Sequence, residues 1–97
     1  MDFRDLKTAD LRLAILQILE QDSGYSLNEH LLTKCLHDLA FKVGADKILT
    51  EAAWLDDQGF VILKQTDPRT ITITSRGVEV AQGHTGAPGV ARPRPGV

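Results

Sequence analysis

The sequence predicts a mainly α-helical domain with one small β-hairpin, in the order helix, helix, helix, strand, strand, helix. Two observations predict this fold class. Between residues 8 and 58, three segments repeat apolar residues at every third or fourth position, which is the spacing of amphipathic helices. Beyond residue 59, strand-forming residues flank a turn that contains proline, which is typical of a hairpin. With 97 residues, the chain has room for one hydrophobic core.

The first predicted helix runs from about Thr8 to Gln21, with Thr8 as its N-cap and Gly24 beyond its C-terminal end. Leu13 and Leu16 widen its apolar stripe beyond the width that one core face needs. We therefore expect Leu13 and Leu16 to take part in a homodimer interface. The stripe itself is formed by Leu11, Ile15, Ile18 and Leu19.

The second predicted helix begins at the capping box Ser26-Leu27-Asn28-Glu29 and ends near Ala40 and Phe41. In a capping box, the Ser26 hydroxyl accepts from the Glu29 amide, and the Glu29 carboxylate accepts from the Ser26 amide. Cys35 is the single cysteine, so we expect a buried thiol on this helix and no internal disulfide bond. The apolar face consists of Leu31, Leu32, Cys35, Leu36 and Leu39.

The third predicted helix runs from about Ala45 to Gln58, and Gly59 is placed to end it in the left-handed conformation. Trp54 lies on its flank, where we expect it to pack against the strands; a contact with a partner protein is the alternative. One side of the helix carries the apolar residues Ile48, Ala52 and Leu55. The opposite side, which we expect to be exposed, carries Asp46, Thr50, Ala53 and Asp57.

The two predicted strands are Phe60–Gln65 and Thr70–Thr74, joined by a four-residue turn. Ser75–Gln82 is predicted to be a short final helix. The remaining residues are rich in glycine and proline, so we expect them to form a flexible tail. The chain is therefore expected to divide into a folded domain, residues 1–83, and a tail, residues 84–97.

A three-helix unit followed directly by a hairpin is the arrangement of winged helix-turn-helix domains. In that fold, the second and third helices form the helix-turn-helix, and the hairpin forms the wing. Two local motifs also resemble those of winged-helix transcription factors. They are Leu55-Asp56-Asp57-Gln58-Gly59-Phe60-Val61 and Ile73-Thr74-Ser75-Arg76-Gly77. We therefore predict a winged helix-turn-helix domain.

Four segments, Met1–Leu6, Asp10–Leu13, Thr50–Leu55 and Gly89–Gly96, resemble a family of small proteins encoded by Mu-like transposable phages and prophages. The resemblance covers nearly the full length of the chain. It implies a winged-helix fold and a location in the cytoplasm of a bacterial host. It implies little about activity.

The charge distribution limits how the chain can bind nucleic acid. The formal net charge is −2, which is unfavourable for binding a phosphate backbone. Residues 1–83 contain nine Lys and Arg against thirteen Asp and Glu, whereas residues 84–97 contain two arginines and no acid. Any contact with DNA must therefore come from a local group of basic residues.

The candidate DNA contacts lie on the third helix, the wing and the tail. Residues in the N-terminal half of the third helix are placed to meet base edges or phosphates in the major groove. A basic wing tip is suited to phosphates or the minor groove, and an arginine-proline arm loses little entropy on ordering. The candidates are Lys47, Thr50 and Glu51 on the helix, Lys64, Arg69 and Thr70 on the wing, and Arg92 and Arg94 in the tail.

Two functions remain open. The first is a phage-encoded DNA-binding protein, a transcriptional regulator, with helix 45–58 in the major groove and wing 64–70 on the backbone. The alternative is a protein-interaction module of phage assembly or packaging that has no DNA affinity. It would bind through the third helix, Trp54 or the tail. The fold and the Arg-Pro tail favour the first function, and the acidic side of the third helix favours the second.

No pattern in the sequence indicates catalysis, a metal site or a cofactor. His30, His37 and His84 are scattered, and no glycine-rich phosphate loop follows a strand. No segment has the pattern of a signal peptide or the length of a membrane span, which favours a cytoplasmic protein. The expected partners are double-stranded DNA and a second copy of the chain, and no small-molecule substrate is indicated.

Overall fold

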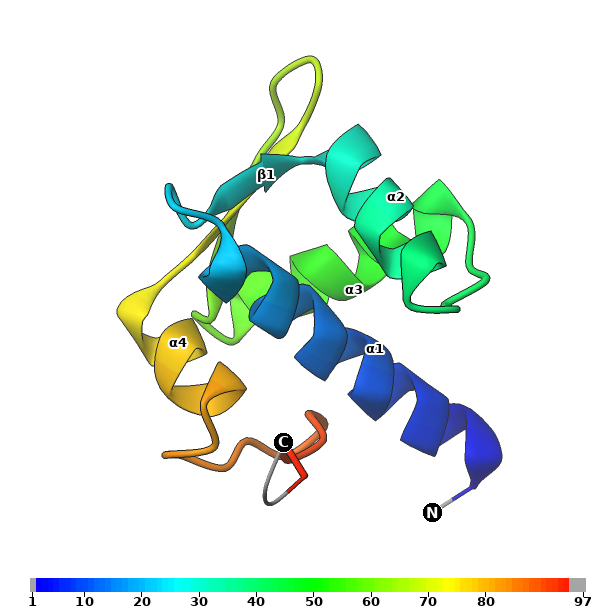
Figure 1. Ribbon diagram of the computed structural model, residues 1–97, viewed down its shortest axis with the longest axis vertical. Helices are drawn as coiled ribbons and strands as arrows, with labels where there is room; N and C mark the ends of the chain where they lie inside the picture. Colours follow the sequence, from blue (N-terminus) through cyan, green and yellow to red (C-terminus); the bar gives the residue numbers. More distant parts are fainter. Residues whose placement is uncertain (1, 95–97) are drawn as a thin grey trace.

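The computed structural model describes residues 2–94 of the chain. Within that range, the chain forms four helices and one antiparallel sheet of three short strands (Figure 1). The predicted order of three helices, a hairpin and a final helix is confirmed, and β1 is an additional strand. In chain order the elements are α1 (Phe3–Gln21), β1 (Ser26–Asn28), α2 (Glu29–Asp38), α3 (Ala45–Asp57), β2 (Val61–Lys64), β3 (Thr70–Ile73) and α4 (Ser75–Ala81).

Helix α1 begins at Phe3, so the prediction that Thr8 caps it is wrong. The side chain of Asp2 is the N-cap, because it accepts a hydrogen bond from the backbone amide of Asp5 at 2.9 Å. Residues 2–7 are all exposed, and Ala9 is the first buried residue. The first turns of α1 therefore project beyond the core, as the dark blue end of the ribbon in Figure 1 shows.

The predicted capping box at Ser26 is wrong, because Ser26–Asn28 forms strand β1. Strand β1 pairs antiparallel with β3, and the Thr72 hydroxyl donates to the Ser26 hydroxyl oxygen at 2.8 Å. Helix α2 is capped instead by Asn28, whose side-chain oxygen accepts from the Leu31 amide at 2.8 Å. Because Ser26 pairs with β3 as a strand residue, it does not cap the helix, and α2 begins at Glu29.

The predicted hairpin is confirmed, and its second strand, β3, is the central strand of the sheet. Strand β3 lies between β1 and β2, with Ile73 opposite Val61 and Thr70 opposite Lys64. Gly59 ends α3 with a φ of +83°, as predicted.

Gly77 of α4 lies so close to the Phe60 carbonyl oxygen that an added Cβ would collide with it. Helix α4 can therefore pack closely on the start of β2 only with glycine at position 77.

Helix α1 crosses the middle of the domain and packs against α2, α3, α4 and β3 (Figure 1). This position explains why α1 is apolar on several sides. Leu13 is 8% exposed and Leu16 is fully buried, so the expectation that they offer a dimer interface is wrong. Cys35 of α2 is half-buried. The largest fully buried side chains are Leu11, Ile15, Leu16, Leu19, Leu32, Leu36, Ile48, Leu55, Val61 and Ile71.

The predicted division at residue 83 is also corrected, because the chain from residue 84 to residue 94 folds back onto the domain (Figure 1). Val90 is 7% exposed and belongs to the hydrophobic core. The Ala91 amide donates to the Ala9 carbonyl oxygen at 3.2 Å. Buried Val90, the half-buried Ala87 and Ala91, and a few hydrogen bonds thus fix a segment whose composition predicts flexibility. Residues 95–97 lie outside the described part of the chain.

Candidate nucleic-acid interface

The exposed side of α3 is the surface that the sequence predicts to enter the major groove. Asp46, Thr50, Ala53 and Asp57 are all exposed, as predicted, while the core residues lie on the opposite side. The Thr50 hydroxyl donates to the Asp46 carbonyl oxygen at 2.8 Å, so towards a ligand it is left to act as an acceptor. The accessible face of α3 thus carries two acids and one hydroxyl.

Glu51 does not face solvent, so its prediction as a DNA contact is wrong. Its side chain is 4% exposed and accepts from Arg12 Nε at 2.7 Å and from Lys47 Nζ at 2.8 Å. Burial alone raises the pKa of the Glu51 carboxyl, but hydrogen bonds from Lys47 and Arg12 and their charges hold that pKa below its ordinary value. Glu51 is therefore an ionised carboxylate that connects α3 to α1.

Arg12 joins this carboxylate to Trp54 and to the C-terminal segment. Its guanidinium stacks on the Trp54 ring, with 3.7 Å between the guanidinium carbon and the ring centroid. Its Nη1 donates to the Gly89 carbonyl oxygen at 3.0 Å. Gly89 has a φ of +89°, and an added Cβ would lie 3.0 Å from the Trp54 ring. Trp54 is therefore held in a stack within one chain, and its alternative role as a partner contact stays a prediction.

Lys47 is exposed, yet its ammonium group is already engaged. It donates to Glu51 at 2.8 Å and lies 3.5 Å from the Thr8 hydroxyl oxygen. Its side chain is 45% exposed, so water or a phosphate oxygen can still reach it. Any contact between Lys47 and DNA would share the ammonium group with Glu51.

The β2–β3 hairpin, which the sequence predicts to be a wing, carries two cations whose side chains differ in their contacts. Arg69 Nε donates to the Gln65 side chain at 2.6 Å, and Arg69 Nη1 lies 3.3 Å from a Glu29 carboxylate oxygen. The Arg69 guanidinium is therefore held towards the start of α2. Lys64 is exposed at the end of β2, opposite the half-buried Thr70. Lys64 is thus the wing cation better placed to reach a phosphate.

The two tail arginines also differ. Arg92 Nη2 donates to the Gly83 carbonyl oxygen at 3.2 Å, which holds this side chain against the chain. Arg94 is exposed. The expected free arm is therefore absent as far as residue 94, and contacts between these arginines and DNA stay predictions.

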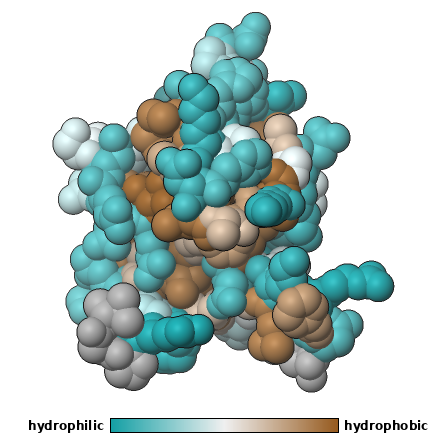
Figure 2. Space-filling model, turned by 45° about the vertical axis from the view of Figure 1, so that its right-hand side comes forward, coloured by the Kyte–Doolittle hydropathy of each residue, from teal (hydrophilic) through white to brown (hydrophobic). Residues whose placement is uncertain are grey.

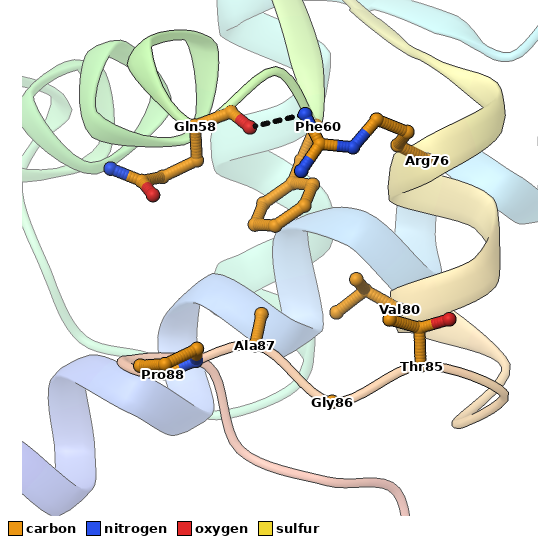
Figure 3. Close-up of a pocket in the computed structure, with 8 residues that line it drawn as sticks. All are labelled: Gln58, Phe60, Arg76, Val80, Thr85, Gly86, Ala87 and Pro88. Atoms are coloured by element: carbon orange, nitrogen blue, oxygen red, sulfur yellow. Dashed lines mark hydrogen bonds between the residues drawn. The ribbon is translucent and has the colours of Figure 1, made fainter.

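A pocket of about 280 Å³ lies between the turn after α3, helix α4 and residues 85–88 (Figure 3). The Arg76 guanidinium lies over the Phe60 ring, 5.2 Å from its centroid, and donates to the Gln58 carbonyl oxygen at 3.1 Å. Arg76 is the charged side chain in the lining and is already engaged, so we assign no ligand to this pocket.

Comparison with known proteins relates the chain to phage proteins. The chain is 37% identical over 92 residues to Uncharacterized protein gp26 of Escherichia phage Mu. This alignment covers 94% of this chain and 95% of gp26. The chain belongs to the gp26 family. It is also 31% identical over 65 residues to an uncharacterized protein of Haemophilus influenzae. This second alignment covers 67% of this chain and 63% of that protein. No family model matches the chain.

Membership of the gp26 family confirms the predicted relationship to Mu-like phages. Neither relative's name states an activity. Among the described residues, no helix has the length and apolarity needed to cross a membrane.

Sequence reasoning missed two features of this gp26-family chain. The first is the role of Arg12, which pairs with a glutamate 39 positions away. Helical spacing could have indicated that Glu51 is buried and needs a cationic partner. Glu51 lies three residues after Ile48 and four before Leu55, so it falls on the core side of the helix. The second is a groove between α1 and the α2–α3 connection. It is lined in part by Arg4, Lys7, Lys42 and Lys47.

Proposed function

We propose that the chain is a winged helix-turn-helix protein of Mu-like phages that binds double-stranded DNA and regulates phage genes. In this proposal α3 lies in the major groove, and the β2–β3 hairpin lies along the backbone. The observation that supports it best is the exposed side of α3, presented next to a hairpin that projects from the domain (Figure 1). Strand β1 adds a third strand to the sheet and fixes the hairpin beside α2.

The basic residues available for phosphate contacts are few. Lys47 lies at the start of α3, Lys42 is exposed in the preceding connection, and Lys64 is exposed on the wing. Arg69 could join them if its guanidinium left Glu29. If these four residues each contact one phosphate, a plot of the logarithm of the binding constant against the logarithm of the salt concentration should have a slope of about −3.6.

Acidic residues on the same side weaken this interaction. Asp46 and Asp57 are exposed on α3 and repel phosphate oxygens. A carboxylate can accept a hydrogen bond from the exocyclic amine of cytosine, so these residues would favour particular sequences while lowering non-specific affinity. We therefore expect weak binding to random duplexes and a steep loss of binding with added salt.

Fluorescence anisotropy with a labelled duplex of mixed sequence, titrated at several salt concentrations, tests this proposal. Lys64→Ala should weaken binding and reduce the salt slope by about 1, because one phosphate contact is lost. Lys34→Ala is the matched control: it removes the same charge from an exposed position of α2 that is not among the proposed phosphate contacts. Equal effects of the two variants would show that only the overall charge matters.

A second function, a protein-interaction module without DNA affinity, is favoured by a separate set of observations. The accessible face of α3 is acidic, and Lys47 and Arg69 are paired with carboxylates. In addition, Arg92 is held against Gly83 instead of extending from the domain. Absence of binding even at low salt would favour this second function.

A further inference from the structure

The Glu51 carboxylate holds two cations, one on each of its oxygens. Oε1 accepts from Arg12 Nε at 2.7 Å, and Oε2 accepts from Lys47 Nζ at 2.8 Å. The three side chains differ in exposure, with 4% for Glu51, 17% for Arg12 and 45% for Lys47. Arg12 is thus the inner partner of the carboxylate, and Lys47 is the outer partner, which a ligand can reach.

The Arg12 guanidinium is fixed from three directions. Its Nε pairs with Glu51, its Nη1 donates to the Gly89 carbonyl oxygen, and its flat face stacks on Trp54. Gly89 is anchored in turn, because the next residue, Val90, is buried in the core. Arg12 therefore stays beside Glu51 whatever Lys47 does.

Lys47 is held less firmly. Within residues 2–94, its ammonium group has two acceptors, Glu51 and, at 3.5 Å, the Thr8 hydroxyl oxygen. The ion pair with Glu51 has i,i+4 spacing and one exposed partner, so water screens it. A phosphate can therefore draw Lys47 outwards, provided that Glu51 does not need it.

The need of Glu51 for Lys47 depends on Arg12. A buried carboxylate without a cation is strongly disfavoured, because burial removes the water that would solvate its charge. With Arg12 in place, Glu51 keeps one close cation when Lys47 turns to a phosphate. Without Arg12, the same movement would leave the carboxylate uncompensated, so Lys47 would stay on Glu51.

We propose that Arg12 is a positioning residue for DNA binding: it compensates Glu51 from the inner side and so releases Lys47 to contact a phosphate. Arg12 itself does not touch the DNA. The inference rests on the proposed DNA-binding function and assigns control of one of its phosphate contacts to a residue of α1.

The surface around Lys47 makes this release important. Lys47 is the third residue of α3, directly after the α2–α3 connection. The side of the molecule that carries this connection is covered mostly by hydrophilic side chains, with apolar ones showing between them (Figure 2). A polyanion approaching there meets individual charges and no broad apolar face, so each available cation contributes to its affinity.

A double-mutant cycle between Arg12 and Lys47, measured by anisotropy with a mixed-sequence duplex, tests the proposal. Loss of one phosphate contact lowers the steepness of the salt dependence by about 0.9, which corresponds to about 8-fold in affinity at about 0.1 M salt. Lys47→Ala and Arg12→Ala should each show this loss. The double variant should also be about 8-fold weaker, because Arg12 acts through a lysine that is no longer present, whereas independent effects would multiply to about 60-fold.

The matched control is Arg76→Ala. Arg76 also places a guanidinium over an aromatic ring and donates to a carbonyl oxygen, but its partners are Phe60 and Gln58. Its replacement should leave the salt dependence unchanged. Arg12→Lys keeps a cation for the carboxylate, so it should retain most of the binding. Circular dichroism checks that each variant is folded, and Arg12→Gln, which keeps a hydrogen-bond donor without the charge, replaces Arg12→Ala if that variant unfolds.

The outcomes separate this inference from the function on which it rests. A wild-type chain that binds no duplex at low salt overturns both. If the wild type binds and Arg12→Ala weakens binding equally with and without Lys47, the positioning role alone is overturned, because a structural effect or a direct phosphate contact does not depend on Lys47. An Arg12→Ala variant that binds as tightly as the wild type also overturns it.

Discussion

Replacing Arg12 by alanine should destabilise the domain more than any other substitution of a charged residue on α1. Arg12 makes three contacts: the ion pair with Glu51 at 2.7 Å, the stack on Trp54 at 3.7 Å, and the hydrogen bond to Gly89 at 3.0 Å. Hydrogen bonds to charged groups contribute about 1.5–3 kcal/mol, and an exposed cation–π contact contributes about 0.5–1 kcal/mol. Because Lys47 still pairs with the carboxylate in the variant, we expect a total loss of about 3 kcal/mol.

That loss is large for a domain of this size. A chain of 97 residues has a free energy of unfolding of about 5–15 kcal/mol. A loss of about 3 kcal/mol should lower the midpoint of thermal unfolding by about 12–24 °C. Circular dichroism measures the transition, and fluorescence gives a second signal, since Trp54 is the single tryptophan and loses its stacked guanidinium.

Arg4→Ala is the matched control, because Arg4 lies on the same helix and is exposed. It should change the unfolding free energy by less than about 0.5 kcal/mol. Arg12→Lys should fall between the two variants, since a lysine keeps the charge and loses the planar stack on Trp54. If Arg12→Ala and Arg4→Ala unfold at the same temperature, the ion-pair network does not hold α1, α3 and the C-terminal segment together.

Three further predictions follow from the same structure. The pKa of Glu51 is lowered in the folded state, so its stabilising effect is complete above about pH 5 and is lost as the pH falls through that pKa. The free energies of unfolding of the wild type and of Glu51→Gln should therefore converge in acid. Gly77→Ala should cost about 1–3 kcal/mol in urea unfolding, because its Cβ meets the Phe60 carbonyl oxygen, whereas Gly44→Ala has open space and should cost less. Truncation after Gly83 should cost about 2 kcal/mol through loss of buried Val90, and a truncated chain as stable as the full one would show that this segment does not pack.

Much of the helical framework and the hairpin could be predicted because their signals are local. The spacing of Ile48, Ala52 and Leu55 identifies the buried side of α3, and Gly59 ends the helix with a positive φ. Strict alternation between Thr70 and Ile73 identifies β3 in the same way. Each of these signals lies within a few residues of the structure that it specifies.

The features that could not be predicted depend on contacts between distant parts of the chain. Strand β1 has three residues, too few to show alternation, and it forms because β3 offers it a free edge. Val90 is an isolated apolar residue among glycines and prolines, so no periodic pattern indicates that it belongs to the core. The charge of Glu51 predicts a place on the exposed face, although its position lies within the core stripe of α3. Its burial depends on Arg12, which lies on another helix 39 positions away.

The candidate interface shows the same division between local and distant effects. Exposure of Thr50 and Lys64 follows from their positions in α3 and β2, and the structure confirms it. The pairing of Arg69 with Glu29 depends on the tertiary fold, because the two residues lie 40 positions apart. The pairing of Lys47 with Glu51 is an i,i+4 contact within α3. Both pairs lower the number of free cations on that side. The sequence therefore overestimates the positive charge available to DNA.

Amide chemical-shift mapping during titration with a mixed-sequence duplex at low salt tests the proposed DNA-binding function most directly. We predict shifts at Thr50 and Ala53 of α3 and at Lys64 of the wing, with little change at Val80 of α4. Shifts confined to α4 or to the C-terminal segment, or no shifts at a large excess of duplex, would contradict DNA binding through α3 and the hairpin.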